Sequence, residues 1–149
     1  MAQARVTVGE EVVGEIGAGM LVLVGVAPGD DTEVAHHLAT RLASLRIFAD
    51  SQGRLNRSLL DTAGGALLVS QFTLFADTSR GHRPSFLGAA PPEQGRLLCA
   101  TLAASMRDLG VSPVGEGRFG AHMEVSSVND GPVTIVVTAG EGPWEAACG

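Results

Sequence analysis

Ser70-Gln71-Phe72-Thr73 is a short stretch whose polar side chains could take part in catalysis. It follows an apolar run, Ala-Leu-Leu-Val at 66–69. A buried hydroxyl or amide without a partner costs on the order of 1–3 kcal/mol, so these side chains need partners, a cleft or water. Ser70 and Thr73 are potential nucleophiles, but no histidine or acid stands at a spacing that would activate either hydroxyl. The stretch alone favours a strand that leaves the core over a polar cleft, and it reveals no catalytic triad.

A second candidate is the turn Asn129-Asp130-Gly131-Pro132, which directly precedes the strand-like run PVTIVVT. Asn-Asp-Gly is a strong turn signal, and proline can be the first residue of a strand. The residue types predict a corner followed by a strand over 132–138. They leave open whether the corner itself has a chemical role.

Basic side chains suggest a third kind of site. Arg80, His82 and Arg83 lie in one polar stretch and Arg118 in another. Guanidinium groups suit phosphates. A net charge of −6 argues against a large nucleic-acid surface, although it allows a local patch that binds a short piece of RNA. Scattered surface arginines explain the pattern equally well.

Other motifs predict no site. The glycines of GEIGAG (14–19) precede a strand, whereas a phosphate-binding fingerprint needs a helix there. His36 and His37 are adjacent on a helix and cannot chelate one ion together. Cys99 and Cys148 lie far apart, and we expect two reduced thiols. None of these patterns predicts a metal or cofactor site.

The elements that position these residues are readable from hydrophobic periodicity. Alternation over 4–8 and 11–16 predicts a hairpin around Gly9-Glu10. The apolar runs 20–26 and 66–75 predict two strands buried on both faces. In 66–75, strand alternation would place Ser70, Phe72 and Leu74 on one face, with Gln71 and Thr73 on the other. The final strands are expected at 122–128 and 132–138, and 50–65 as loop with a short strand or turn.

Two helices are expected. One begins at Asp30, whose capping box would include Glu33, and its apolar stripe comprises Val34, Leu38, Leu42 and Leu45. The other begins at Pro91-Pro92 and ends at Gly110, with Leu98, Leu102, Met106 and Leu109 at helical spacing.

These elements predict an α+β fold with a curved, barrel-like or two-layer sheet and two main helices packed outside. The 149 residues fit one domain over 1–149, with a flexible tail at 139–149. No apolar run approaches the roughly 20 residues that span a bilayer. The N-terminus does not resemble a signal peptide, so we expect a cytoplasmic protein without a membrane partner.

The motifs in combination resemble one family. SQFTLFAD, TSRGHRPSF, GRFGAHM and VSSVNDGPVT, in this order and spacing, closely resemble the D-aminoacyl-tRNA deacylases. The stretches at 6–26 and 45–56 also resemble this family, so the resemblance covers roughly residues 4 to 138. The family signatures are SQFT at Ser70 to Thr73 and GPVT at Gly131 to Thr134.

The resemblance implies a homodimeric, metal-free hydrolase that cleaves the ester between a D-amino acid and the terminal adenosine of tRNA. Glycine mischarged on tRNA-Ala is implied as a further substrate. DNA is not an expected partner. Arg80, Arg83 and Arg118 are candidate tRNA contacts.

The resemblance also implies residue roles. The catalytic set is Ser70, Gln71, Phe72 and Thr73: the Gln71 and Phe72 amides would form the oxyanion hole, and Ser70 and Thr73 would shape the pocket. The substrate-binding set is Gly131, Pro132, Val133 and Thr134. A cis Gly131-Pro132 pair would enter the partner subunit's pocket, hold the α-amino group with main-chain carbonyls and exclude L side chains.

Alternatives stay open on mechanism and activity. Either the terminal 2′-OH of the substrate helps to activate water, or Thr73 is a covalent nucleophile, as it would also be in a general esterase. Family members usually open with a strand carrying Gln-Arg-Val ahead of the residues matching Ala4, where this chain has only Met-Ala-Gln. That departure predicts a weakened or unusual first strand, an uncovered sheet edge and reduced activity, or else a true start codon that lies further upstream. The alternative function is therefore a tRNA- or amino-acid-binding homologue with weakened turnover.

Overall fold

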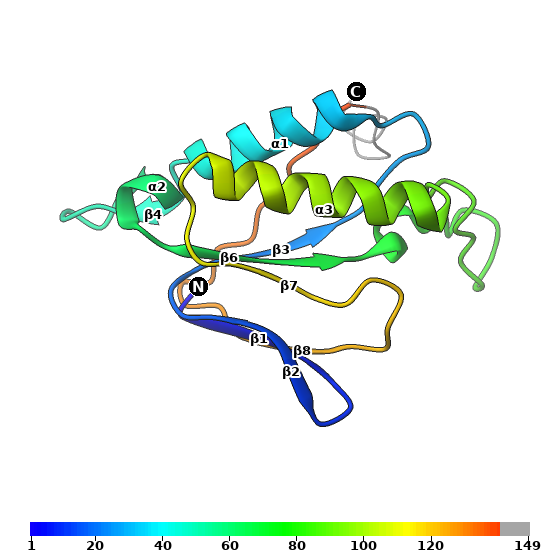
Figure 1. The fold of residues 1–149 in the computed structure, drawn as a ribbon, viewed down its shortest axis with the longest axis horizontal. Coiled ribbons are helices and arrows are strands. Elements are labelled where there is room, and N and C mark those ends of the chain that lie inside the picture. Colours follow the sequence, from blue (N-terminus) through cyan, green and yellow to red (C-terminus); the bar gives the residue numbers. More distant parts are fainter. Residues whose placement is uncertain (141–149) are drawn as a thin grey trace.

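A computed structural model describes residues 1–140, which form three layers (Figure 1). Two long helices, α1 (Thr32–Ser44) and α3 (Pro92–Asp108), cover one face of a parallel sheet ordered β3-β6-β7. An antiparallel sheet ordered β2-β1-β8 packs on the opposite face. The α+β class with two main helices is therefore confirmed. Of the expected sheet forms, the structure shows two layers, and each layer is a three-stranded sheet.

The antiparallel sheet begins with the expected hairpin. β1 (Gln3–Val8) pairs with β2 (Glu11–Ile16), with an irregularity between Val6 and Thr7. β8 (Glu124–Val128) pairs with the other edge of β1. The core face of this sheet packs on β6. The buried side chains at this contact are Ala4 and Val6 of β1, Ile16 of β2, and Leu67 and Val69 of β6.

The central sheet is parallel. β3 (Gly19–Val24) pairs with β6 (Gly65–Ser70), which in turn pairs with β7 (Val114–Glu116). β6 is buried from Gly65 to Val69, as the apolar run predicts. The same prediction is wrong for β3, where Leu21 and Val22 are half-buried and Leu23 is exposed. β3 is an edge strand, so one side of it lacks a neighbouring strand.

The helices meet the sheet through a continuous core. α3 buries Leu98, Leu102 and Met106 at the expected spacing. Burying a side chain of this size contributes about 1.5–3 kcal/mol. The start of α1 differs from the expectation: Asp31, not Asp30, caps it by accepting a 3.0 Å hydrogen bond from the Val34 amide. Asp30 instead accepts from the Ala27 amide at 2.8 Å.

The expected apolar stripe of α1 is only partly packed. Leu42 is buried, whereas Val34, Leu38 and Leu45 are half-buried. The smaller side chains Ala35, Ala39 and Ala43 make up the rest of the buried face.

Two expected strand segments are corrected by the structure. The strand over 66–75 ends at Ser70, and Phe72–Phe75 forms a 3₁₀ helix (η1), so the predicted alternation of Gln71, Phe72 and Thr73 on strand faces is wrong. Residues 132–138 form no strand within the described part of the chain. Strand propensity cannot form a ladder without a partner, and no described strand pairs with this segment.

Short elements complete the fold. β4 (Phe48–Ala49) and β5 (Leu55–Arg57) form a small hairpin, and α2 (Leu59–Thr62) starts with a capping box between Ser58 and Asp61. α2 and β7 were not expected from the sequence. No helix among residues 1–140 is long and apolar enough to cross a membrane. Of the expected tail at 139–149, residues 141–149 lie outside the described residues, as does Cys148.

Candidate active site

The SQFT motif lies where β6 ends, at the right of Figure 1. Ser70 is the last strand residue, and the chain then turns into η1. The Gln71 amide donates a 2.7 Å hydrogen bond to the carbonyl of Val24, the last residue of β3. A Cβ on Gly25 would lie 2.6 Å from the Phe75 ring, so glycine at this position permits η1 to pack against the end of β3.

This geometry determines which backbone donors are available. The Leu74 amide donates to the Gln71 carbonyl and the Ala76 amide to the Thr73 carbonyl. Among the described residues, no acceptor is found for the Phe72 or Thr73 amides. The expected oxyanion donors were Gln71 and Phe72. Because the Gln71 amide is already engaged by Val24, the adjacent pair at Phe72 and Thr73 provides the available donors.

The hydroxyl of Thr73 has one side-chain partner in this part of the chain. The Gln71 side-chain amide nitrogen donates to Thr73 Oγ1. An amide cannot remove a proton from a hydroxyl. No histidine or carboxylate within residues 1–140 is hydrogen-bonded to Thr73 or Ser70, so no activated nucleophile is assembled.

Ser70 lines a pocket of about 270 Å³ between the end of β6, β7 and α3. Arg118 and Phe119, from the GRFGAHM motif, line the same pocket, so the structure brings two of the sequence motifs together. The Arg96 guanidinium lies 5.0 Å from the centroid of the Phe119 ring. Arg118 also pairs with Glu11 of the hairpin at 3.2 Å.

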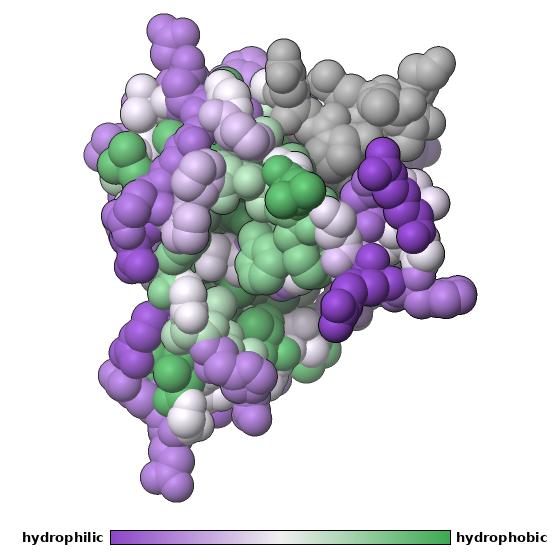
Figure 2. Space-filling view, turned by 90° about the vertical axis from the view of Figure 1, so that its right-hand side faces the viewer, coloured by the Kyte–Doolittle hydropathy of each residue, from purple (hydrophilic) through white to green (hydrophobic). Residues whose placement is uncertain are grey.

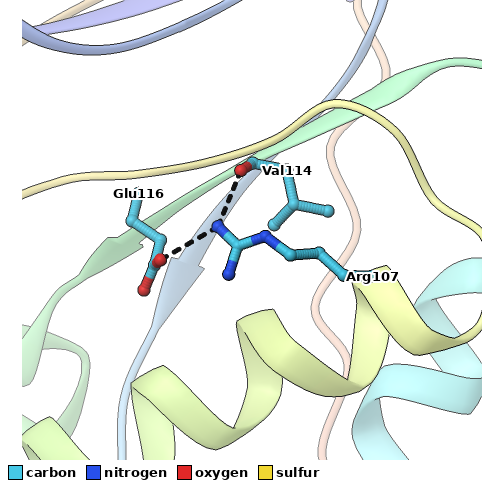
Figure 3. A network of polar contacts seen from close by, with 3 residues as sticks. All are labelled: Arg107, Val114 and Glu116. Atoms are coloured by element: carbon cyan, nitrogen blue, oxygen red, sulfur yellow. Dashed lines mark hydrogen bonds and ion pairs between the residues drawn. The ribbon is translucent and has the colours of Figure 1, made fainter.

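Cys99 and Glu116 complete one wall of this pocket. Burial, with a smaller effect of the Glu116 carboxylate, raises the pKa of Cys99 to about 11. Cys99 therefore stays a neutral thiol near neutral pH. Figure 3 shows how Glu116 is held: Arg107 donates to its carboxylate at 3.0 Å and to the Val114 carbonyl at 2.9 Å.

A polar loop over residues 76–90 adjoins the motif. It is closed by a bridge between Asp77 and Ser85, and the Phe86 ring stacks edge-on against Phe72 with centroids 5.0 Å apart. Hydrogen bonds from the Ser79 hydroxyl and amide lower the pKa of Asp77. Arg80, His82 and Arg83 are exposed and bond to no described residue. These side chains are available to a ligand.

The surface on this side of the molecule is mixed in character. Figure 2 shows hydrophobic surface in the centre of this face with hydrophilic side chains around it. Among the apolar side chains near the motif, Phe72 is 59 % exposed and Leu87 is 93 % exposed. The arrangement suits a ligand with both flat apolar and charged parts, such as a nucleotide.

Gly131-Pro132 forms an exposed turn with a cis peptide bond, as the resemblance implies. The Asn129 side chain holds the turn, because its oxygen accepts from the Val133 amide at 3.1 Å and its nitrogen donates to Thr134 Oγ1 at 3.0 Å. Gly131 has φ +146°, which strongly favours glycine.

The structure does not bring Gly131-Pro132 to the SQFT motif within one chain. The turn follows Val128, which accepts from the Ala2 amide near the Met1–Gly19 end of β3. Ser70 lies opposite Val24, at the other end of the β3–β6 pair (Figure 1). Over six residues, a strand separates its ends by roughly 17 Å.

The sequence did not single out Phe86, Arg96, Cys99 or Glu116 as site residues. Arg96 and Cys99 are three residues apart on α3, and this helical spacing was a signal that they share a face. Phe86 and Glu116 gave no such signal. Among residues 1–140, no group of three His, Cys, Asp or Glu side chains could hold a metal ion.

Comparisons with known proteins agree with the motifs. A family model described as D-Tyr-tRNA(Tyr) deacylase matches residues 1–138. A D-aminoacyl-tRNA deacylase of Deinococcus radiodurans is 58 % identical over 137 residues, which cover 92 % of this chain and 94 % of that protein. A D-aminoacyl-tRNA deacylase of a Roseiflexus species is 59 % identical over 137 residues, covering 92 % and 88 %.

Solved structures share the fold. A structure titled c-Myc DNA Unwinding Element Binding Protein is 34 % identical, with a TM-score of 0.87 over 94 % of this chain and 95 % of that one. A probable eukaryotic D-amino acid tRNA deacylase has a TM-score of 0.72 over 85 % and 88 %; at 18 % identity it supports the fold alone.

Proposed function

The chain belongs to the D-Tyr-tRNA(Tyr) deacylase family, and from this we propose that it hydrolyses the ester joining a D-amino acid to the terminal adenosine of tRNA. The products are the free D-amino acid and tRNA. The observation that carries the proposal is the family match over residues 1–138, because this range includes both Ser70–Thr73 and Gly131–Thr134.

The ester carbonyl is placed at the start of η1. Negative charge develops on its oxygen when water attacks, and the Phe72 and Thr73 amides, which have no acceptor among residues 1–140, would stabilise it. One such preorganised donor typically contributes about 3–4 kcal/mol to lowering the barrier. Gln71 has a different role here: its amide fixes the backbone to Val24, and its side chain orients Thr73.

Water is activated with help from the substrate. The terminal ribose 2′-OH lies next to the ester and assists the attacking water. Support for this route is that Thr73 Oγ1 is bonded to an amide nitrogen and that no base contacts it among the described residues. The competing route, with Thr73 as a covalent nucleophile, requires a base that would have to come from elsewhere.

Chirality is read by the partner subunit in a homodimer. Gly131 and Pro132 of one subunit enter the other subunit's pocket, where their carbonyls hold the substrate's α-amino group. An L side chain would collide with this backbone, whereas a D side chain points away and glycine has none, so glycine mischarged on tRNA-Ala is also cleaved. The exposure of the turn, and its distance from Ser70 along the β3–β6 pair, support an action across subunits.

The tRNA acceptor end lies along the exposed loop 76–90 and the β1–β2 hairpin. Arg80 and Arg83 are exposed and bond to no residue within 1–140, so their guanidinium groups can bind its phosphates, and Arg118 at the Ser70 pocket is a third contact. With a net charge of −6, these contacts are local, so binding requires few phosphates and depends weakly on salt.

One observation favours the alternative of a binding homologue with weakened turnover: β3, which anchors Gln71, lacks a strand neighbour on its outer side in the described chain. An activity assay separates the two functions. D-Tyr-tRNA and L-Tyr-tRNA are incubated separately with the protein and ester loss is followed. The deacylase predicts rapid loss of the D ester only, and binding without turnover favours the alternative.

A further inference from the structure

The chain between residues 71 and 90 leaves the sheet and returns to it at almost the same place. The Gln71 amide donates to the Val24 carbonyl at 2.7 Å, and the Ala90 amide donates to the Val26 carbonyl at 2.8 Å. Carbonyls two residues apart on an extended chain point in the same direction and lie roughly 7 Å apart. The backbone at the end of β3 therefore holds both ends of this 71–90 loop.

A side chain of the loop packs against the same backbone. A Cβ on Gly25 would lie 2.6 Å from Phe75 Cε2, and one on Gly88 would lie 3.9 Å from Phe75 Cδ1. The Phe75 ring thus lies between the end of β3 and the returning part of the loop. Because residues 24–26 are consecutive, a shift of this backbone would move both ends of the loop and its packed ring together.

Three carbonyls just beyond β3 converge on one side chain. Residues 27–30 form a β-turn, in which the Asp30 amide donates to the Ala27 carbonyl at 3.1 Å. The side-chain nitrogen of Gln94, in the first turn of α3, donates to the carbonyls of Pro28 at 2.8 Å and Asp30 at 2.9 Å. The Ala27 carbonyl lies 3.4 Å from the same nitrogen. An amide group has two hydrogens, so it makes two full bonds and one weaker contact here.

Gln94 is placed to connect the loop to the end of β3. α3 begins at Pro92, directly after the loop, on the side of the molecule where β3 ends (Figure 1). The half-buried Gln94 side chain reaches back from this helix to the turn. Its neighbours on α3 have other partners, because Glu93 pairs with Arg96 and Arg96 lies over the Phe119 ring. Gln94 is thus the side chain of this helical turn that bonds to the 27–30 turn.

We propose that Gln94 is a positioning residue for ester hydrolysis. By holding the 27–30 turn it fixes the end of β3, which in turn fixes the start of the loop where the Phe72 and Thr73 amides lie. The inference rests on the proposed function, since that function assigns these two amides to the ester oxygen. Gln94 acts through the Val24 carbonyl and not on the substrate.

Loss of this tie should affect kcat more than KM. A shift of the two amides weakens an interaction that is strongest in the transition state. The part of the loop that carries Arg80 and Arg83 is closed separately by the bridge between Asp77 and Ser85, so the phosphate contacts are retained.

Two substitutions at Gln94 separate hydrogen bonding from packing. Gln94→Met keeps nearly the same length without a donor, whereas Gln94→Lys has three donors on a longer stem. With D-Tyr-tRNA, Gln94→Met should lower kcat about tenfold or more and change KM less than about threefold. Gln94→Lys should keep kcat within about threefold of the parent. A role in packing alone predicts the opposite order, because Met is the better match to apolar neighbours.

Amide hydrogen exchange gives a readout that needs no activity. In Gln94→Met, exchange at Gln71 and Ala90 should be about tenfold faster, while exchange at Leu67 in the middle of β6 stays unchanged. Gln52→Met and Gln52→Lys, at an exposed position between β4 and β5, are the matched controls for size and charge and should behave as the parent.

Parent values of kcat and exchange in Gln94→Met, or an equal loss of kcat in Gln94→Lys, would overturn the proposal. Absence of hydrolysis by the parent chain would instead overturn the proposed function. Exchange at Gln71 and Ala90 would then still decide whether Gln94 holds the loop.

Discussion

The amide of Gln71 donates to the carbonyl of Val24 at 2.7 Å, so the end of β3 fixes the backbone at the start of the SQFT motif. This contact leaves Phe72 and Thr73 as the first residues whose amides have no acceptor in the described chain. We therefore propose that the oxyanion donors are the Phe72 and Thr73 amides, one residue later than the resemblance implies.

Removing the Phe72 amide should abolish most catalysis. Phe72 is the first residue of η1, where proline is sterically acceptable, and Gln71 before it has φ −144° and ψ 79°, outside the α region. Phe72→Pro should lower kcat by about 10²–10³-fold, the usual effect of losing one oxyanion donor. Phe72→Ala is the control, because it also loses the ring contact with Phe86 but keeps the amide. Equal losses in both variants would show that the amide has no special role.

The substrate's 2′-OH should matter more than the Thr73 hydroxyl. Thr73→Ala should stay within about tenfold of the parent rate, whereas D-aminoacyl-tRNA ending in 2′-deoxyadenosine should react about 10²–10⁴-fold more slowly. Single-turnover rates measure both effects. Complete loss of activity in Thr73→Ala with normal turnover of the deoxy substrate would instead identify Thr73 as the nucleophile.

Gly131 should act on the active site of the other subunit. Gly131→Ala strains a backbone at φ +146° and places a Cβ 3.0 Å from Val133 Cγ2. A displacement of about 1 Å at a positioning group costs on the order of 10²-fold in rate. Gly120→Ala is the control, since Gly120 has φ +77° but its Cβ would contact nothing within 4 Å.

Mixing two inactive variants tests whether Gly131 of one subunit acts at the Phe72 site of the other. If Gly131→Ala and Phe72→Pro chains form mixed dimers at random, half the dimers contain one intact site, and roughly a quarter of the parent activity should return. An absence of recovery, despite mixed dimers seen by native mass spectrometry, would place Gly131 and Phe72 of one chain in the same site.

Cys99 should be protected from alkylation and should make stability depend on alkaline pH. Its pKa is about 11, so at pH 8 it carries roughly 10²-fold less thiolate than a thiol with the ordinary pKa of 9.0 would. Because folding raises this pKa, the contribution of the neutral thiol to the free energy of unfolding is complete below about pH 9. This contribution is lost as the pH rises through about 11. Peptide mapping after iodoacetamide treatment measures the alkylation of Cys99. Urea denaturation at pH 8 to 11 measures the free energy of unfolding, with Cys99→Ala for comparison. Rapid labelling of Cys99 at pH 8 would contradict this.

Local signals in the sequence predicted the hairpin and both helices, because their periodicity and turns depend on nearby residues. The 3₁₀ turn at Phe72 was missed because it depends on Val24 and Gly25, which are far away in sequence. The strand at 132–138 was predicted wrongly because its propensity is strong but its ladder partner is absent from the described chain. The pocket at Ser70 was missed in part because Arg96 and Glu116 reach it from separate elements.

If the proposed function is right, the protein distinguishes the two hands of an amino acid esterified to tRNA. The most direct measurement is competition: an equimolar mixture of D-Tyr-tRNA and L-Tyr-tRNA is treated in one reaction, and the enantiomeric composition of the remaining ester is followed over time. We predict that the D ester disappears first and that the remaining ester becomes almost entirely L. A remaining ester that stays racemic while it is hydrolysed would contradict the account.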